Sequence, residues 1–259
     1  MNFKLTGSVR SALVAFLFVL AATVPFQAQQ FAGAPIVQRI DGAVDAREQE
    51  LLGYTVTEHY AVFRGHDQEH PAADMQVKTT YRRDVGKSYR ILSESGPELL
   101  RKALEMVLEN EQRITQPANR AHAVITSENY EMTVKGNETI DGQDCVALAL
   151  KPRRESPYLF NGTIWVDAHN QAIVRLHGFT ARSPSIFTGV SEVFRDYATI
   201  EGFPLATHAK AISNSWLLGQ TVIKIDYLNY QLEHQAASDH TRAGIRRPTR
   251  EAMTSDVCH

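Results

Sequence analysis

From Asn129 to Leu232 the sequence alternates apolar and polar side chains in short segments, each ended by a turn. Period-two alternation places successive side chains on opposite faces of a pleated sheet. The alternating segments lie at 130–135, 146–150, 164–166, 173–179, 190–194 and 222–228. The predicted turns between them are Gly136-Asn137, Asp141-Gly142, Ala168-His169-Asn170 and Glu201-Gly202. Because a parallel crossover needs a dozen or more residues, segments joined this closely are predicted to form an antiparallel meander.

Such a meander needs a cover, because a sheet with an apolar face and two edges must either close on itself or be covered. A helix with a wide apolar surface precedes it in the chain. Ser95-Gly96-Pro97-Glu98 has the form of a capping box that would start this helix. Its apolar residues are Leu99, Leu100, Ala103, Leu104, Met106, Val107 and Leu108. The arc is broader than a surface helix needs, so we expect a cover that is held by apolar contacts and can move aside.

The segment before this helix predicts another helix and three strands. Apolar residues recur at helical spacing within Pro35–Leu52. Strands are predicted at 54–62, 75–81 and 88–93, and Glu58 falls on the apolar face of the first of them. After the covering helix polarity rises and Pro117 interrupts the pattern, so an irregular, lid-like stretch is expected over 109–122.

The two ends of the chain differ from its middle. Lys4 and Arg10 give a positively charged region before an uncharged apolar run from Ser11 to Val24, and a cleavage point is expected after Ala28. The run is shorter than the roughly 20 residues that a membrane-spanning helix needs. Residues 1–28 are therefore predicted to be an export signal, with an uncleaved anchor as the alternative. One domain is expected over 29–234 and a polar, disordered tail over 235–259.

Net charge and cysteine content limit the classes of partner and of disulfide structure that can be expected. The formal charge of −2 gives no overall attraction to nucleic acid, so no nucleic-acid partner is expected. Cys145 lies in a predicted strand and Cys258 is next to the C-terminus. Two cysteines do not make a disulfide framework, so we expect a buried thiol and a tail thiol. A disulfide between them is the alternative in an exported chain.

The order of elements and several phrases resemble the LolA/LolB-like family of outer-membrane lipoprotein-sorting carriers. The phrases are Tyr130-x-Met132, Gly136-x-Glu138-x-Ile140-x-Gly142, Cys145 with Leu148, Gly162-Thr163-Ile164-Trp165-Val166-Asp167, and Asp196-Tyr197 followed by Gly202-Phe203-Pro204-Leu205. The resemblance implies a mainly β (α+β) fold, a half-open antiparallel β-barrel with helices covering its concave face. It also implies a periplasmic location, no cofactor, and acyl chains of lipoproteins or other lipids as ligands. No single residue role is carried over from the family.

The function expected on this basis is a non-enzymatic carrier. It would hold acyl chains in an apolar cavity between sheet and helices and pass them towards the outer membrane, between a membrane-protein donor and acceptor. The residues expected to contact lipid are Leu99, Leu100, Leu104, Val107, Leu108, Trp165, Phe179 and Trp216, although aromatic residues in strands are more often ordinary core. The alternatives are a lipid-responsive sensor of the same fold that binds a membrane protein, and a hydrolase.

One sequence motif imitates a catalytic site. His66-Asp67-Gln68-Glu69-His70 matches the H-x-x-E-H pattern of a zinc peptidase. That chemistry needs a helix that projects both histidines from one face. Gly65 and Pro71 flank the motif between two predicted strands, so we expect a polar hairpin loop and no metal site. The sequence also lacks a G-x-S-x-G elbow and a carboxylate pair that can be placed across a cleft, so no catalytic residue is predicted.

Overall fold

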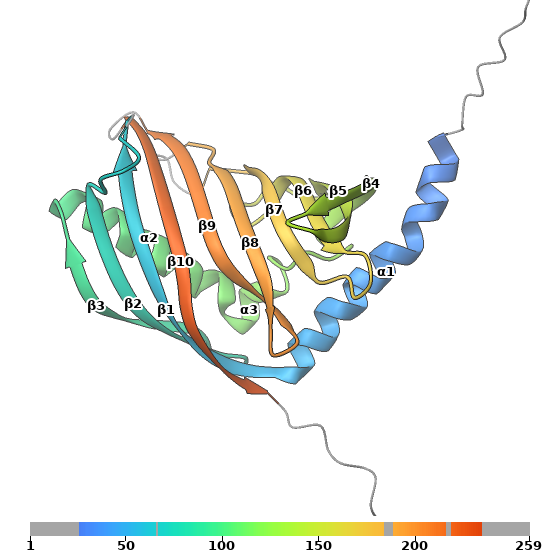
Figure 1. Cartoon of the computed structure of the whole chain (residues 1–259), viewed down its shortest axis with the longest axis horizontal. Coiled ribbons are helices and arrows are strands. Elements are labelled where there is room, and N and C mark those ends of the chain that lie inside the picture. The colour runs from blue at the N-terminus through green and yellow to red at the C-terminus, as the bar shows by residue number, and fades with distance from the viewer. Residues whose placement is uncertain (1–25, 66, 184–188, 216–218, 235–259) are drawn as a thin grey trace, which may run out of the picture.

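The computed structural model of the protein describes residues 26–65, 67–183, 189–215 and 219–234. Within these ranges ten strands form one antiparallel sheet in the order β3-β2-β1-β10-β9-β8-β7-β6-β5-β4 (Figure 1). The strands are β1 (Leu51–Arg64), β2 (Ala73–Arg82), β3 (Gly86–Ser95), β4 (Tyr130–Ile140), β5 (Gln143–Pro152), β6 (Phe160–Asp167), β7 (Ile173–Thr180), β8 (Glu192–Ile200), β9 (Phe203–Ser215) and β10 (Gly219–His234). The sheet is curved but open, because β3 and β4 form its two edges.

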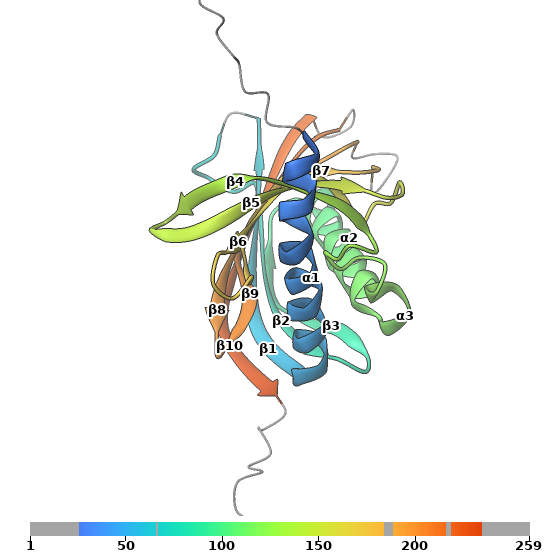
Figure 2. The same cartoon turned by 90° about the vertical axis from the view of Figure 1, so that its right-hand side faces the viewer.

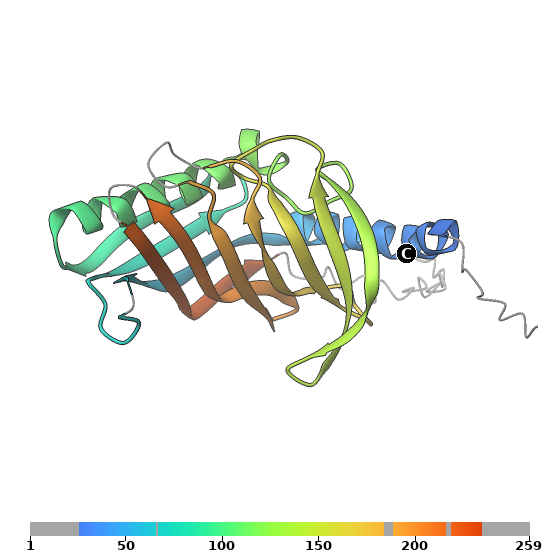
Figure 3. The ribbon, with the colours of Figure 1, turned by 90° about the horizontal axis from the view of Figure 1, so that it is seen from above.

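Three helices lie against this sheet. They are α1 (Phe26–Glu50), α2 (Glu98–Thr115) and the short α3 (Pro117–Arg120). Figures 2 and 3 show α1 and α2 on the same, concave side of the sheet. The predicted architecture, a half-open antiparallel barrel with helices covering its concave face, is thereby confirmed. Among the described residues, no helix is long and apolar enough to span a membrane.

The predicted meander is confirmed from β4 to β10, with two differences. The turn predicted at Gly136-Asn137 is wrong: β4 continues through both residues, and a shift of register between Val134 and Gly136 marks a bulge. Glycine suits a bulge because its backbone reaches positive φ without strain, and here φ is 152°. The second difference is β9, most of which carries small or polar residues and therefore gives no apolar alternation.

The helix boundaries also differ from expectation. The predicted helix over Pro35–Leu52 begins earlier, at Phe26, and ends at Glu50, because Leu51 already pairs in β1. The predicted capping box is absent: Pro97 is the N-cap of α2, and no side chain caps it. The stretch expected to be irregular instead continues α2 to Thr115 before α3 follows.

Two apolar cores divide the concave side between the helices. The first core joins α2 to β1, β2 and β10, with Leu100, Leu104 and Leu108 at most 2% exposed. The second core joins Ile36 and Ile40 of α1 to residues of β4, β5, β6 and β7. The curved sheet is therefore packed by one helix on each half.

Several predictions concern residues outside the described ranges or outside the cores. Ala28, after which cleavage is predicted, is described only by its backbone, and most of the predicted signal, the predicted tail and Cys258 lie outside the described residues. Cys145 is a buried free thiol, as expected for one of the two cysteines. Residues 67–72, which contain part of the zinc-peptidase pattern, form no helix between β1 and β2. Across the described residues, no cluster of metal-binding side chains is found.

Candidate functional site

A cavity of about 390 Å³ lies between the C-terminal half of α1, the connection after α3, and strands β6 to β9. Its apolar walls come from Ile40, Val44, Ile125, Phe160, Leu176 and Val193. These residues belong to elements far apart in sequence, which the antiparallel meander and the helix bring together (Figures 1 and 2). Cavities of this size and lining are typical of small-ligand sites.

The cavity exists because α1 changes character along its length. Ile36 and Ile40 reach the sheet and are buried in the second core. Ile40 is also the first residue of the cavity wall, and one turn further on Ala43, Val44 and Ala46 line the cavity without filling it. Small side chains cannot fill the distance between a helix and a curved sheet, which larger ones would close. The space follows from this local composition of α1.

Polar groups gather at the other part of the cavity wall. Arg47 and Glu48 of α1 and Arg195 of β8 line it, and Glu48 is paired with Arg120 at 2.7 Å. Within the described part of the chain, the Nε atoms of Arg47 and Arg195 are buried and have no hydrogen-bond partner. The cavity is therefore apolar along Ile40 and Val44 and carries guanidinium donors beyond them.

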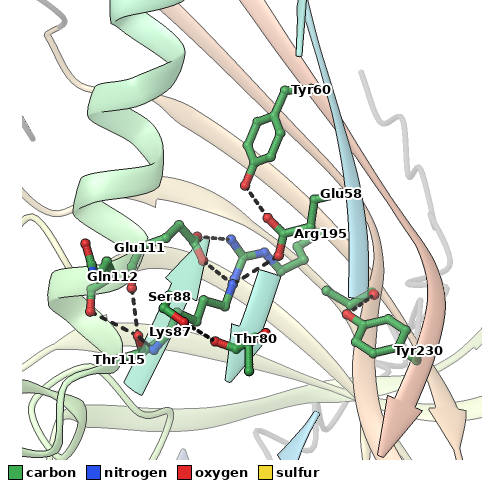
Figure 4. Close-up of polar contacts among 11 residues, drawn as sticks. Glu58, Tyr60, Thr80, Lys87, Ser88, Glu111, Gln112, Thr115, Arg195 and Tyr230 are labelled. Carbon is green, nitrogen blue, oxygen red and sulfur yellow. Dashed lines mark hydrogen bonds and ion pairs between the residues drawn. The ribbon is translucent and has the colours of Figure 1, made fainter. Parts of the chain in front are cut away.

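Arg195 also belongs to a buried ion network between the sheet and α2 (Figure 4). Its Nη2 donates to Glu111 Oε1 of α2 at 3.2 Å, and Glu111 Oε2 accepts from Lys87 Nζ at 2.8 Å. Lys87 Nζ lies 3.5 Å from Glu58 Oε1 of β1, and the hydroxyl of Tyr60 donates to Glu58 Oε2 at 2.5 Å. Two cations and two carboxylates thus balance in a region where Glu58 is 1% exposed.

The network lowers the pKa of its carboxyl group Glu111 and raises the pKa of its amine Lys87, so both groups stay charged. Burial alone would raise the pKa of Glu111, but the charges of Lys87 and Arg195 outweigh it and lower that pKa to about 2. Burial alone would lower the pKa of Lys87, but Glu111 and Glu58 raise it well above its ordinary value. The charged forms are therefore strongly favoured on both sides of the Lys87–Glu111 pair.

This network changes the expectation for α2. An apolar cover that moves aside freely was expected, yet α2 also carries Glu111, which two buried cations hold. The backbone N–H of Lys87 additionally donates to the Thr115 hydroxyl at the C-terminal end of α2. Gly86 allows this approach, because a Cβ at that position would lie 2.9 Å from the Thr115 carbonyl oxygen. Polar contacts therefore hold α2 to the sheet in addition to its apolar contacts.

The residues predicted to contact lipid lie elsewhere in the molecule. Leu100, Leu104 and Leu108 fill the core beneath α2, Val107 packs against that core, and Leu99 is 53% exposed. On the sheet, Phe179 is 49% exposed and Trp165 Nε1 donates to Glu138 Oε2 at 2.8 Å. Trp216 lies outside the described residues. Of the described members of this set, none lines the 390 Å³ cavity.

Trp165 instead borders a shallow hollow on the opposite, convex face of the sheet. His177 and Phe194 stack there with ring centroids 4.1 Å apart, and Arg175 donates to Asp196 at 2.5 Å. These side chains alternate along β7 and β8 with inward residues such as Leu176 and Arg195. The aromatic residues of the meander therefore lie on both faces, and an aromatic residue in a strand does not by itself identify the cavity wall.

Sequence reasoning did not identify the polar part of the cavity. Arg195 gave a usable signal, because it falls between Val193 and Tyr197 on the same face of its strand, and all three line the cavity. Glu58 gave the same signal in β1. Arg47 gave none, since an arginine near the end of a helix is ordinarily solvated.

No protein-family model matches the sequence, and no curated protein matches it significantly. Several solved structures align with most of this chain at TM-scores below 0.5. A DUF1329 family protein from Desulfovibrio piger aligns at 13% identity over 83% of this chain and 98% of its own, with a TM-score of 0.41. A domain assigned to outer membrane lipoprotein-sorting proteins, from Vibrio parahaemolyticus, aligns at 12% identity over 81% and 95%, with a TM-score of 0.43.

A LolA superfamily protein from Nitrosomonas europaea aligns at 15% identity over 82% of this chain and 99% of its own, with a TM-score of 0.36. At such identities and TM-scores these alignments do not transfer a ligand. The function has to follow from the cavity and charges of this chain.

Proposed function

We propose that this protein is an exported, non-enzymatic carrier that binds the acyl part of a lipid or lipoprotein in the cavity beneath α1. The observation that carries the proposal is the 390 Å³ space with walls from Ile40, Val44, Phe160 and Leu176. Each buried methylene of an acyl chain contributes about 0.8 kcal/mol, so an apolar slot alone can hold a chain firmly. The ligand would be collected and released in the periplasm, between a membrane donor and an outer-membrane acceptor.

The two helices have different parts in this proposal. The half of the sheet beneath α2 is filled by Leu100, Leu104 and Leu108, so a chain can enter there only when α2 moves. The half beneath α1 already offers space. A single chain therefore binds first under α1, and displacement of α2 would enlarge the site for a larger cargo.

The test is lipid uptake by the purified protein, measured by native mass spectrometry after incubation with bacterial lipid extract. Val44→Asp places a carboxylate in the cavity wall and should reduce uptake at least tenfold. Val85→Asp is the matched control, because Val85 is 57% exposed in the turn between β2 and β3 and should leave uptake unchanged. Circular dichroism and denaturant unfolding show whether both variants stay folded.

Two results would refute parts of the proposal. Uptake by folded Val44→Asp at the wild-type level would place the acyl chain outside this cavity. No uptake by the wild type from any lipid would remove the carrier function, and persistent copurification of a membrane protein would then favour the sensor alternative.

A further inference from the structure

We propose that the ligand of the cavity is a single-chain amphiphile with an anionic head group, and that Arg47 binds this head group. The proposal rests on the acyl-binding function above and adds the chemistry of the head group and the number of chains. Both additions follow from the shape and the charges of the cavity wall.

The order of residues along α1 gives the ligand its direction. Ile40, Ala43 and Val44 line the cavity first, and Arg47, Glu48 and Glu50 line it one to two turns later. At 1.5 Å per residue, Ile40 and Glu50 are about 15 Å apart along the helix axis. One wall therefore changes from apolar to charged over the length of a short amphiphile. The acyl chain fits along the apolar part and the head group beside Arg47.

The charges favour an anion over a neutral or cationic head group. Glu48 is paired with Arg120, and Arg195 shares Glu111 with Lys87, so these lining charges are already compensated. Among the described carboxylates, none lies within ion-pair distance of Arg47, and its buried Nε donates to no described acceptor. Glu50 is the remaining acidic residue of the wall, and it is exposed.

A guanidinium group with unused hydrogen-bond donors is well suited to bind an anionic head group. It presents its N–H groups in a planar fork that matches the oxygens of a carboxylate or phosphate. A buried donor without an acceptor costs free energy, and an anionic ligand would remove that cost at Arg47. Arg195 Nε, which is also buried without a partner and also on the cavity wall, offers a second donor.

The volume limits the number of chains. A methylene is about as large as a water molecule, whose share of liquid volume is about 30 Å³, so 390 Å³ holds on the order of a dozen methylenes. One chain of medium length matches this space, whereas a lipid with two or three chains would extend beyond it unless a helix moves. Dodecanoate and dodecyl phosphate are therefore suitable probes.

The experiment compares the affinities of dodecanoate, dodecyl phosphate and dodecanol for the full chain by isothermal titration calorimetry. The three probes contain the same number of carbon atoms, with one methylene fewer in the alkyl chain of dodecanoate, and only the first two are anions at pH 8. We expect both anions to bind at least tenfold more tightly than the alcohol, as one charge-assisted hydrogen bond allows. Preference between the two anions distinguishes a carboxylate ligand from a phosphate ligand.

Two variants assign this preference to Arg47. Arg47→Gln removes the charge and should bring the anions to the affinity of the alcohol. Arg39→Gln removes the same charge from an exposed position of the same helix and should leave the preference intact. Equal affinity of all three probes for the wild type, or an unchanged preference in Arg47→Gln, would overturn the inference while leaving acyl binding in place. Failure of all three to bind would instead remove the proposed function.

Discussion

The two halves of the concave side show how one sheet can be packed in two ways. Beneath α2, leucines four residues apart fill the space, and their side chains are at most 2% exposed at Leu100, Leu104 and Leu108. Beneath α1, the corresponding turns carry Ala43 and Val44, and a cavity remains. The difference lies in the size of side chains at equivalent depths. The α2 half is therefore a filled core, and the α1 half contains the proposed binding space.

The charged side chains also differ between the two halves, in whether they have a partner within the protein. Glu111 joins α2 to Lys87 and to Arg195 of the cavity wall, so these charges are paired within the protein. In the α1 half, Arg47 lines the cavity without a described carboxylate partner. A buried charge that is paired supports one conformation, whereas one that is unpaired in a cavity is available to a ligand.

The largest expected effect comes from breaking the network of the α2 half. Glu111→Gln leaves Lys87 and Arg195 with a single carboxylate, Glu58, and should lower the free energy of unfolding by about 3–5 kcal/mol. Glu98→Gln removes a carboxylate from the same helix whose side chain is 70% exposed, and should cost at most about 0.5 kcal/mol. Urea titrations at pH 7 measure both. Equal losses in the two variants would show that the network does not hold α2.

The next effect tests the apolar packing of the same half. Leu104→Ala creates a cavity at a fully buried position and should lower the free energy of unfolding by about 3 kcal/mol. Acyl uptake by the folded variant should remain near the wild-type level, because Leu104 does not line the cavity under α1. A fall in uptake at temperatures where the variant is folded would show instead that the chain binds beneath α2.

A third prediction concerns pH. The pKa of Glu111 is about 2 in the folded protein and 4.5 ordinarily, so its stabilising effect is complete above pH 4.5 and is lost as pH falls towards 2. The loss is at most about 3 kcal/mol. It should appear as a shrinking difference between the unfolding free energies of wild type and Glu111→Gln over this range. A difference that stays constant from pH 5 to pH 2.5 would contradict the assigned pKa.

Much of the fold could be predicted because its strands repeat a simple period. The apolar alternation of β4, β5, β6, β7, β8 and β10 identified the meander, and helical spacing identified both long helices. Strand β9 was not predicted, because its inward residues include Ala209, which is too small to stand out as apolar against its polar neighbours. The bulge at Gly136 was mistaken for a turn, because a glycine followed by an asparagine is typical of both.

The candidate site was harder to predict, for a physical reason. A cavity forms where side chains are too short to fill the space between a helix and a sheet. The sequence does not give the distance between α1 and the sheet. The leucines of α2 had the stronger apolar pattern, but strong patterns mark filled core. Charged residues on apolar faces were the better signal, since Glu58 and Arg195 both proved to be members of the buried network.

The smallest expected effect would make the α1 half resemble the α2 half. Ala43→Leu extends a side chain into the cavity from a turn that already faces it. The added methylenes should raise the free energy of unfolding by up to about 1 kcal/mol, because they fill existing space instead of displacing packed atoms. Acyl uptake should fall severalfold, because the chain loses the volume that the leucine takes.

Ala103→Leu on α2 is the matched control for this last change. Ala103 is half-buried on the helix whose half of the sheet is already filled, so the same enlargement there should give no gain in stability and no loss of uptake. If Ala43→Leu leaves uptake unchanged, or if the two variants behave alike, the binding space does not lie under α1. The contrast between the two halves would then be one of packing alone.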